Sequence, residues 1–196
     1  MINIVLFGPP GSGKGTQAEY LIKKFDLIQI STGDLFRYNI KNGTELGKLA
    51  KSYMDQGHLV PDEVTINMLT EEVKKHTDAK GLIFDGFPRT AAQSLELENI
   101  VKDVLNEEID LCLSLVVEDE ILVQRILERG KTSGRTDDAD ESIIRNRIKQ
   151  YYAKTAEVAE LFKEQGKYVE VNGVGEINEI SEKLFAEVEK VINKGK

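Results

Sequence analysis

Short apolar runs that alternate with longer stretches of helical period constrain the fold of this 196-residue chain more than any other feature. The runs lie at residues 2–7, 27–30, 82–85, 109–117 and 167–171. Between them, apolar residues recur at intervals of three and four, as they do in amphipathic helices. Nearly continuous apolar strands that alternate with helices predict an α/β fold, in which helices cover both faces of a parallel sheet.

Two segments do not fit this alternation. Residues 31–60 predict two or three short helices without a strand, and residues 129–138, with the sequence RGKTSGRTDD, predict a glycine-rich polar loop between two helices. We expect both segments to be mounted on the sheet rather than to belong to it. Segments of this kind often carry function or move.

The overall composition argues against several classes of partner. The formal net charge is −8 and there is no basic tail, whereas nucleic acids and anionic membranes bind basic surfaces. No apolar run reaches the roughly 18 residues that a bilayer requires. The apolar N-terminus has neither a preceding basic segment nor the small-residue cleavage site of a signal peptide. We therefore expect a cytoplasmic protein.

The residue types that usually bind transition metals are scarce. The two histidines, His58 and His76, are not at ligand spacing, and the single cysteine, Cys112, lies in the apolar run LCLSLVV. One cysteine forms neither a disulfide nor a zinc cluster. We expect Cys112 to be a small buried apolar side chain, and we expect no zinc site.

The segment GPPGSGKGT, residues 8–16, predicts a phosphate-binding loop because it follows a strand and precedes a helix. Its glycines allow backbone N–H groups to converge on phosphate oxygens, and the N-terminus of the following helix favours an anion. Lys14 supplies a charge that can follow a transferred phosphoryl group. A glycine-rich turn without a ligand would need neither this lysine nor so many glycines.

Gly15 occupies the position after the lysine, where a Ser or Thr hydroxyl usually binds Mg²⁺. The first hydroxyl comes one residue later, on Thr16. A bound Mg²⁺ must then depend largely on phosphates and water, which suits an ion that retains several waters. We expect no direct protein ligand, and we expect Asp85, at the end of LIFD, to act through water. The alternative role for Asp85 is to cap the next turn.

Four motifs, in this order, resemble those of the adenylate kinases: GPPGSGKGT (8–16), STGDLFR (31–37), FDGFPRT (84–90) and SGRTDD (133–138). The resemblance covers essentially the whole chain. It implies reversible transfer of the γ-phosphoryl group of MgATP to AMP, which gives two ADP, and a monomeric enzyme with these nucleotides as its partners. A phosphotransferase of this kind serves purine nucleotide salvage and energy homeostasis.

The resemblance also implies the organisation of the chain. The core is a P-loop NTPase-type domain with a five-stranded parallel sheet, made by residues 1–30, 61–128 and 139–196. Residues 31–60 form an excursion that binds the nucleoside monophosphate (NMP). Residues 129–138 form a short lid, without the inserted β segment that some relatives have. Both additions are expected to move.

Two sets of binding residues follow from the same resemblance. The expected ATP site comprises Gly11, Ser12, Gly13, Lys14, Gly15, Thr16, Arg129 and Gly175. The expected AMP site comprises Thr32, Arg37, His58, Leu59, Val60, Gly86, Phe87, Pro88, Arg89, Gln93, Arg135 and Arg147. Gln93 is expected to read the adenine edge. Met54 is either a wall of the AMP pocket or an ordinary core residue.

The use of arginine supports a site for two phosphate chains. Six of the seven arginines fall where the family places its phosphate clamps, although lysine is much the commoner cation of this chain. A guanidinium grips phosphate oxygens bidentately, whereas an ammonium acts as a point charge. The expected catalytic residues are Lys14, Arg89, Arg125, Arg129, Arg135 and Arg147.

The lid region leaves two questions open. One residue more than usual lies between Asp138 and Arg147, so Arg145 competes with Arg147 as the clamp. Asp137 and Asp138 either latch the closed lid or orient metal-bound water.

Two other functions remain as alternatives. A UMP/CMP kinase of the same superfamily would share the fold and mechanism, but Thr32 in STGD and the TAAQ after FPR favour adenine. A nucleotide-binding switch that does not turn over would usually carry a Ser or Thr after the lysine and a water-positioning glutamine, and neither is evident here.

Overall fold

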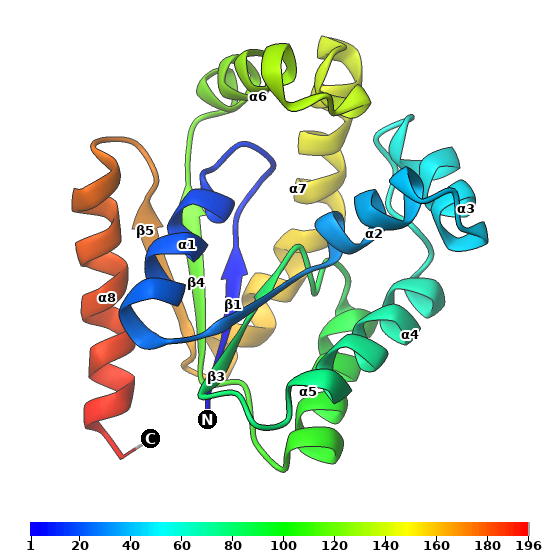
Figure 1. The fold of residues 1–196 in the computed structure, drawn as a ribbon. Helices are drawn as coiled ribbons and strands as arrows, with labels where there is room; N and C mark the ends of the chain where they lie inside the picture. Colours follow the sequence, from blue (N-terminus) through cyan, green and yellow to red (C-terminus); the bar gives the residue numbers. More distant parts are fainter. Residues whose placement is uncertain (196) are drawn as a thin grey trace.

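The computed structural model describes residues 1–195, except the side chain of residue 156 (Figure 1). Its five strands form one parallel sheet in the order β2-β3-β1-β4-β5. The strands are β1 (Ile2–Phe7), β2 (Ile28–Ser31), β3 (Gly81–Asp85), β4 (Leu111–Val116) and β5 (Tyr168–Asn172). The predicted α/β fold with a five-stranded parallel sheet is confirmed.

The α-helices of the described part alternate with the strands, apart from two extra helices after β2 and one extra helix after β4. They are α1 (Lys14–Phe25), α2 (Thr32–Lys41), α3 (Glu45–Met54), α4 (Asp62–Val73), α5 (Ala91–Leu105), α6 (Asp119–Ser133), α7 (Glu141–Glu164) and α8 (Ile177–Asn193). Two short 3₁₀ helices, η1 (Lys74–His76) and η2 (Thr136–Asp138), follow α4 and α6.

The two faces of the sheet are buried by different helices. Alternate residues of β1 point to opposite faces, so Ile4 and Leu6 pack with residues of α1 and α8, whereas Val5 and Phe7 pack with residues of α4, α5 and α7. Figure 1 shows α1 and α8 on one side of the sheet and α4, α5 and α7 on the other. Burial on both faces explains why β1 reads as a continuous apolar run.

The order of the strands determines where a ligand can bind. The chain leaves β1 toward the β2–β3 side of the sheet, and later crosses back to β4 on the other side of β1. Connections that diverge in this way leave a crevice at the carboxyl ends of the strands. The loop after β1 and the segment after β3 both begin at this edge.

The helices α2 and α3 form a pair with a small core of its own, in which Phe36, Ala50 and Val60 are buried. Their close approach depends on Gly47, since a Cβ at that position would lie 2.2 Å from the carbonyl oxygen of Asn39. The sequence predicted no strand in residues 31–60, which is correct except at Ser31, the last residue of β2. Figure 1 shows the pair beyond the carboxyl edge of the sheet.

The predicted loop at residues 129–138 is partly wrong, because α6 continues through Ser133. Gly130 lies inside this helix rather than ending it, and its Cβ would lie 2.6 Å from the carbonyl oxygen of Asp138. The glycine therefore allows close packing between α6 and η2. Gly134, with φ of +66°, ends the helix in the left-handed conformation that favours glycine.

The remaining expectations about the fold concern burial. Cys112 is fully buried in β4, as predicted, and this burial raises the pKa of its thiol. None of the helices within residues 1–195 is both long enough and apolar enough to cross a membrane.

Candidate active site

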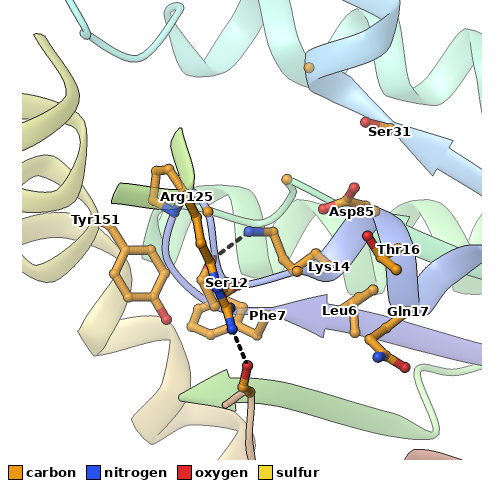
Figure 2. Close-up of a pocket in the computed structure, with 18 of the residues that line it drawn as sticks. Leu6, Phe7, Ser12, Lys14, Thr16, Gln17, Ser31, Asp85, Arg125 and Tyr151 are labelled. Atoms are coloured by element: carbon orange, nitrogen blue, oxygen red, sulfur yellow. Dashed lines mark hydrogen bonds between the residues drawn. The ribbon is translucent and has the colours of Figure 1, made fainter. Parts of the chain in front are cut away.

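A cavity of about 590 Å³ opens at the carboxyl edge of the sheet, between the loop after β1 and the helices α6 and α7. Its walls include the 8–16 loop, the segment from Asp85 to Arg89, and side chains of α2, α6 and α7. Figure 2 shows Lys14 between Arg125 on one side and Thr16 and Asp85 on the other.

The loop after β1 is shaped for close approach by an anion. Gly8, with φ of +137°, has no room for a side chain, because a Cβ there would lie 2.7 Å from Ser12 Oγ and 2.8 Å from the Leu115 carbonyl oxygen. Gly13, with φ of +99°, ends the loop, and apart from its chain neighbours nothing lies within 4 Å of a Cβ placed on it. The backbone therefore faces open space at the first turn of α1, where the N–H groups have no acceptor within the helix.

The Ser12 hydroxyl is a further polar group of this loop. Ser12 is 1% exposed, and its Oγ has no hydrogen-bond partner within residues 1–195. A buried hydroxyl without a partner is costly. The loop thus contains a donor that a bound phosphate could satisfy.

Lys14 is held against the loop by two hydrogen bonds. Its Nζ donates to the carbonyl oxygens of Gly8 (2.8 Å) and Pro9 (3.0 Å). Burial lowers the pKa of the Lys14 ammonium to about 8; Asp85 opposes this effect, whereas the nearby Arg89 and Arg147 add to it. A phosphate group in the cavity would favour the charged form of Lys14, which burial and the two arginines disfavour.

All six arginines that the sequence predicted as clamps line this cavity. They come from separate elements and are Arg37 (α2), Arg89 (after β3), Arg125 and Arg129 (α6), Arg135 (before η2) and Arg147 (α7). Positive side chains gathered in one crevice repel each other and focus a field that attracts anions.

Carboxylates neutralise part of this charge. Arg129 donates to both oxygens of Asp138, at 2.6 and 2.9 Å, and Arg147 Nη1 donates to Oδ1 of the same residue at 2.7 Å. Burial opposes ionisation of Asp138, but the hydrogen bonds from the two arginines outweigh it and lower the pKa. Asp137 lies 3.1 Å from Arg147. Asp138 thus joins η2 to α6 and α7, and Asp137 joins η2 to α7, which favours the latch alternative.

In the described part of the chain, Arg89 lacks a carboxylate partner, as does Arg125, which donates to the Gly173 carbonyl oxygen. The Nε of Arg89 donates to the Gly86 carbonyl oxygen at 2.8 Å, and no carboxylate within residues 1–195 forms a salt bridge with it. Burial, followed by repulsion from Arg147, lowers the pKa of Arg89 to about 10. An anion beside Arg89 would stabilise the charged form of its guanidinium.

A second, smaller cavity of about 80 Å³ lies between the α2–α3 pair, α5 and α7. Among the predicted AMP residues, those that line it are Thr32, Arg37, His58, Leu59, Val60, Gly86, Arg89, Gln93 and Arg147. Met54 is also part of its wall, which favours the pocket alternative for this residue. Phe87, Pro88 and Arg135 line only the larger cavity.

The two cavities meet at a shared set of residues. Both are lined by Gly33, Arg37, Gly86, Arg89, Arg147, Tyr151 and Thr155. The predicted ATP residues, Gly11 to Thr16, Arg129 and Gly175, line the larger cavity only. Each predicted binding residue therefore lies on one cavity or on the boundary between them.

The geometry separates Arg147 from Arg145. Arg147 lies on both cavities, whereas Arg145 is on the outer side of α7 and binds Glu120 (2.9 and 3.1 Å) and Glu141 (2.8 Å). The position of Arg147 favours it as the clamp.

Tyr151 and Thr155 are among the wall residues that were not predicted from the sequence. They follow Arg147 at intervals of four, so all three lie on one face of α7. The Thr155 hydroxyl donates to the Arg89 carbonyl oxygen at 3.1 Å. The four-residue spacing from Arg147 was the signal that could have found them.

The α2–α3 pair and the segment around η2 touch across the cavity. The Thr136 hydroxyl donates to Asp55 Oδ1 (3.1 Å), and Arg135 lies 3.5 Å from Asp34. The Asn146 amide donates to the Gln56 carbonyl oxygen at 2.8 Å. These contacts bridge the crevice from the α2–α3 side to η2 and α7.

The site offers oxygen donors for a hard metal ion but no preformed cage. Asp85 accepts a hydrogen bond from Gln29 through Oδ2 (3.1 Å), and Thr16 lies on the same wall (Figure 2). In the described part of the chain, no group of three or more His, Cys, Asp or Glu side chains could hold a metal ion. This donor set fits an ion that is bound mainly by phosphates and water, as Mg²⁺ is.

The fold and the site define a P-loop nucleotide phosphotransferase. The first strand of a parallel sheet leads through a glycine-rich loop and a lysine into α1, and arginines surround the crevice. A family model described as "Adenylate kinase" matches residues 6–167. The chain belongs to the adenylate kinase family, whose members are phosphotransferases that act on ATP and AMP.

Curated relatives agree over nearly the whole chain. The protein named adenylate kinase of Flavobacterium psychrophilum is 57% identical over 94% of this chain and 96% of its own length. That of Flavobacterium johnsoniae is 51% identical over 97% of this chain and 100% of its own length. That of Renibacterium salmoninarum is 42% identical over 97% of this chain and 98% of its own length.

The lowered pKa of Lys14 predicts proton uptake on nucleotide binding. The group is largely neutral in the free protein at pH 9, and bound phosphates favour its charged form, so ATP should bind with uptake of about one proton. The same shift disfavours folding below pH 8, and this penalty disappears as the pH rises from about 8 to 10.5. Calorimetric titration at pH 9, in two buffers with different ionisation enthalpies, measures the uptake.

Two conservative variants control this measurement. Lys14→Arg keeps the charge but does not titrate, and should abolish the uptake. Lys24→Arg, at an exposed position of the same helix, should leave it unchanged. An uptake that persists in Lys14→Arg would contradict the assignment.

Proposed function

We propose that this chain catalyses the reversible, Mg²⁺-dependent transfer of the terminal phosphoryl group of ATP to AMP, giving two ADP. One observation carries the proposal: two cavities meet at Arg37, Arg89 and Arg147. Two nucleotides that react through their phosphates must lie tail to tail, with their phosphates at such a boundary. Catalysis of this reaction consists mainly of alignment and charge neutralisation.

In this proposal the larger cavity binds ATP. The backbone of residues 11–16 surrounds the β- and γ-phosphates, and Lys14 leaves its carbonyl partners to follow the transferred group. Arg125 and Arg129 bind the phosphate chain from α6. Gly175 lies beside the base or ribose.

The smaller cavity binds AMP. Arg37 and Arg89 grip its phosphate, while Gln93 and the segment from His58 to Val60 contact the adenine. Arg135 and Arg147 close over the reacting groups from the lid side. A guanidinium at each position spreads the charge of the phosphoryl group as it moves.

Mg²⁺ would be held by the nucleotide phosphates and by water that Asp85 orients. Once bound, the ion neutralises the charge that develops on the β- and γ-phosphates. Asp85 fits this role because its Oδ1 makes no hydrogen bond to residues 1–195, whereas Oδ2 is fixed by Gln29.

The proposal divides the chain into a core (1–30, 61–128 and 139–196), an NMP-binding excursion (31–60) and a short lid (129–138). In the structure the excursion contacts the lid through Asp55 and Thr136, and the core through Gln56 and Asn146. Opening of the excursion would break both contacts. Closure would exclude water from the transfer site. That the enzyme works as a cytoplasmic monomer remains a prediction.

A parallel assay with four acceptors tests the proposed reaction. Nucleoside diphosphate formation from ATP is measured with AMP, UMP, CMP or GMP, each with and without Mg²⁺. We expect turnover with AMP alone and only with the metal. Preference for UMP or CMP would contradict the assignment of the base pocket, and no turnover with any acceptor would favour a nucleotide-binding switch.

The two neighbouring arginines of α7 provide a matched test of the clamp. Arg147→Lys should lower kcat/KM about 100-fold, because an ammonium cannot grip two phosphate oxygens in the fixed fork geometry. Arg145→Lys should stay within about twofold, since exposed ion pairs contribute little. Steady-state kinetics with ATP and AMP measure both, and equal losses would contradict the placement of Arg147.

A further inference from the structure

Gln93 is fixed in one orientation by two groups that cannot exchange roles. Its Oε1 accepts the backbone N–H of Arg89 at 2.8 Å, and its Nε2 donates to Asp62 Oδ1 at 2.8 Å. A backbone N–H is only a donor, and an ionised carboxylate is only an acceptor. Rotation of the amide by 180° would therefore place donor against donor and acceptor against acceptor.

Asp62 is itself held in place. Its other oxygen, Oδ2, accepts the Thr90 hydroxyl at 2.9 Å, and Thr90 Oγ1 accepts the Gln93 backbone N–H at 3.2 Å. Asp62 is the first residue of α4, where a negative charge is favourable, and Thr90 is the N-cap of α5. Two helix N-termini thus fix the carboxylate relative to the amide.

The orientation decides what Gln93 can bind. Gln93 is 2% exposed and lines the smaller cavity. After its two contacts, the amide retains one N–H and one carbonyl lone pair. Adenine offers a ring-nitrogen acceptor beside the N6 amino donor, which complements this pair. A 6-oxopurine has an acceptor at position 6, which would face the Gln93 carbonyl oxygen.

We propose that Asp62 is a specificity-determining positioning residue, which selects 6-aminopurines over 6-oxopurines by preventing Gln93 from flipping. The inference rests on the proposed AMP site. Asp62 does not line either cavity, so it acts on the base only through Gln93. A glutamine free to rotate could read both kinds of base.

The test compares AMP with IMP as acceptors, because they differ at position 6 and the adjoining ring nitrogen but share the sugar and phosphate. Asp62→Asn keeps the shape and can donate as well as accept, so one of the two barriers to flipping is removed. We expect the AMP/IMP ratio of kcat/KM to fall about tenfold. The KM for AMP should rise, while the KM for ATP should not change.

Two further variants make the result decisive. Glu63→Gln removes the same charge at the next, exposed residue of α4, and should keep the wild-type ratio. Asp62→Ser shortens the side chain so that it cannot reach Gln93, and should lower the ratio as well; it replaces Asp62→Asn if that variant does not fold. Circular dichroism and thermal unfolding check both.

The outcomes separate this inference from the proposed function. A wild-type ratio in a folded Asp62 variant, with normal AMP turnover in the wild type, would overturn the positioning role alone. Wild-type protein that does not phosphorylate AMP would overturn the proposed function, and the inference with it. A fall in the ratio that also occurs in Glu63→Gln would overturn the inference in favour of a general charge effect.

Discussion

Electrostatic repulsion among the cations of the crevice is the constraint on which the site depends. Lys14 and six arginines line one cavity, and the aspartates nearby neutralise only part of their charge. The lowered pKa values of Lys14 and Arg89 indicate where the positive charge is least neutralised. Lys14 lines the larger cavity and Arg89 lies on the boundary of both, so phosphates bound there would supply the negative charge that the fold lacks. A protein that binds its substrates in this way gives up some stability for function.

The parallel sheet brings the phosphate-binding loop and the elements that carry the arginines to one edge. Parallel strands end at a common edge, so β1 and β3 deliver the 8–16 loop and the Asp85–Arg89 segment to neighbouring positions. The arginines come from elements that stand above this edge, and Asp138 joins two of those elements by bonding Arg129 and Arg147. The same ion pairs that reduce repulsion therefore also fix η2 to α6 and α7.

The sequence was informative where residue type alone determines the structure. Apolar runs predicted the five strands, and the concentration of arginine in motifs predicted the walls of the crevice. It misled at Gly130, because a glycine needed for helix packing reads like a helix breaker. The bonds from Asp62 to Gln93 and from Thr155 to Arg89 connect distant positions. No local pattern encodes such contacts, so only the tertiary structure reveals them.

The central claim is that Arg89 carries a charge that the free protein does not satisfy. Thermal unfolding of Arg89→Met without ligand tests this most directly, because methionine removes the charge and retains an unbranched side chain of similar reach. The account predicts a higher midpoint than in the wild type, together with loss of AMP turnover. A lower midpoint in the absence of ligand would show that the charge is already balanced in the free protein, and would contradict the account.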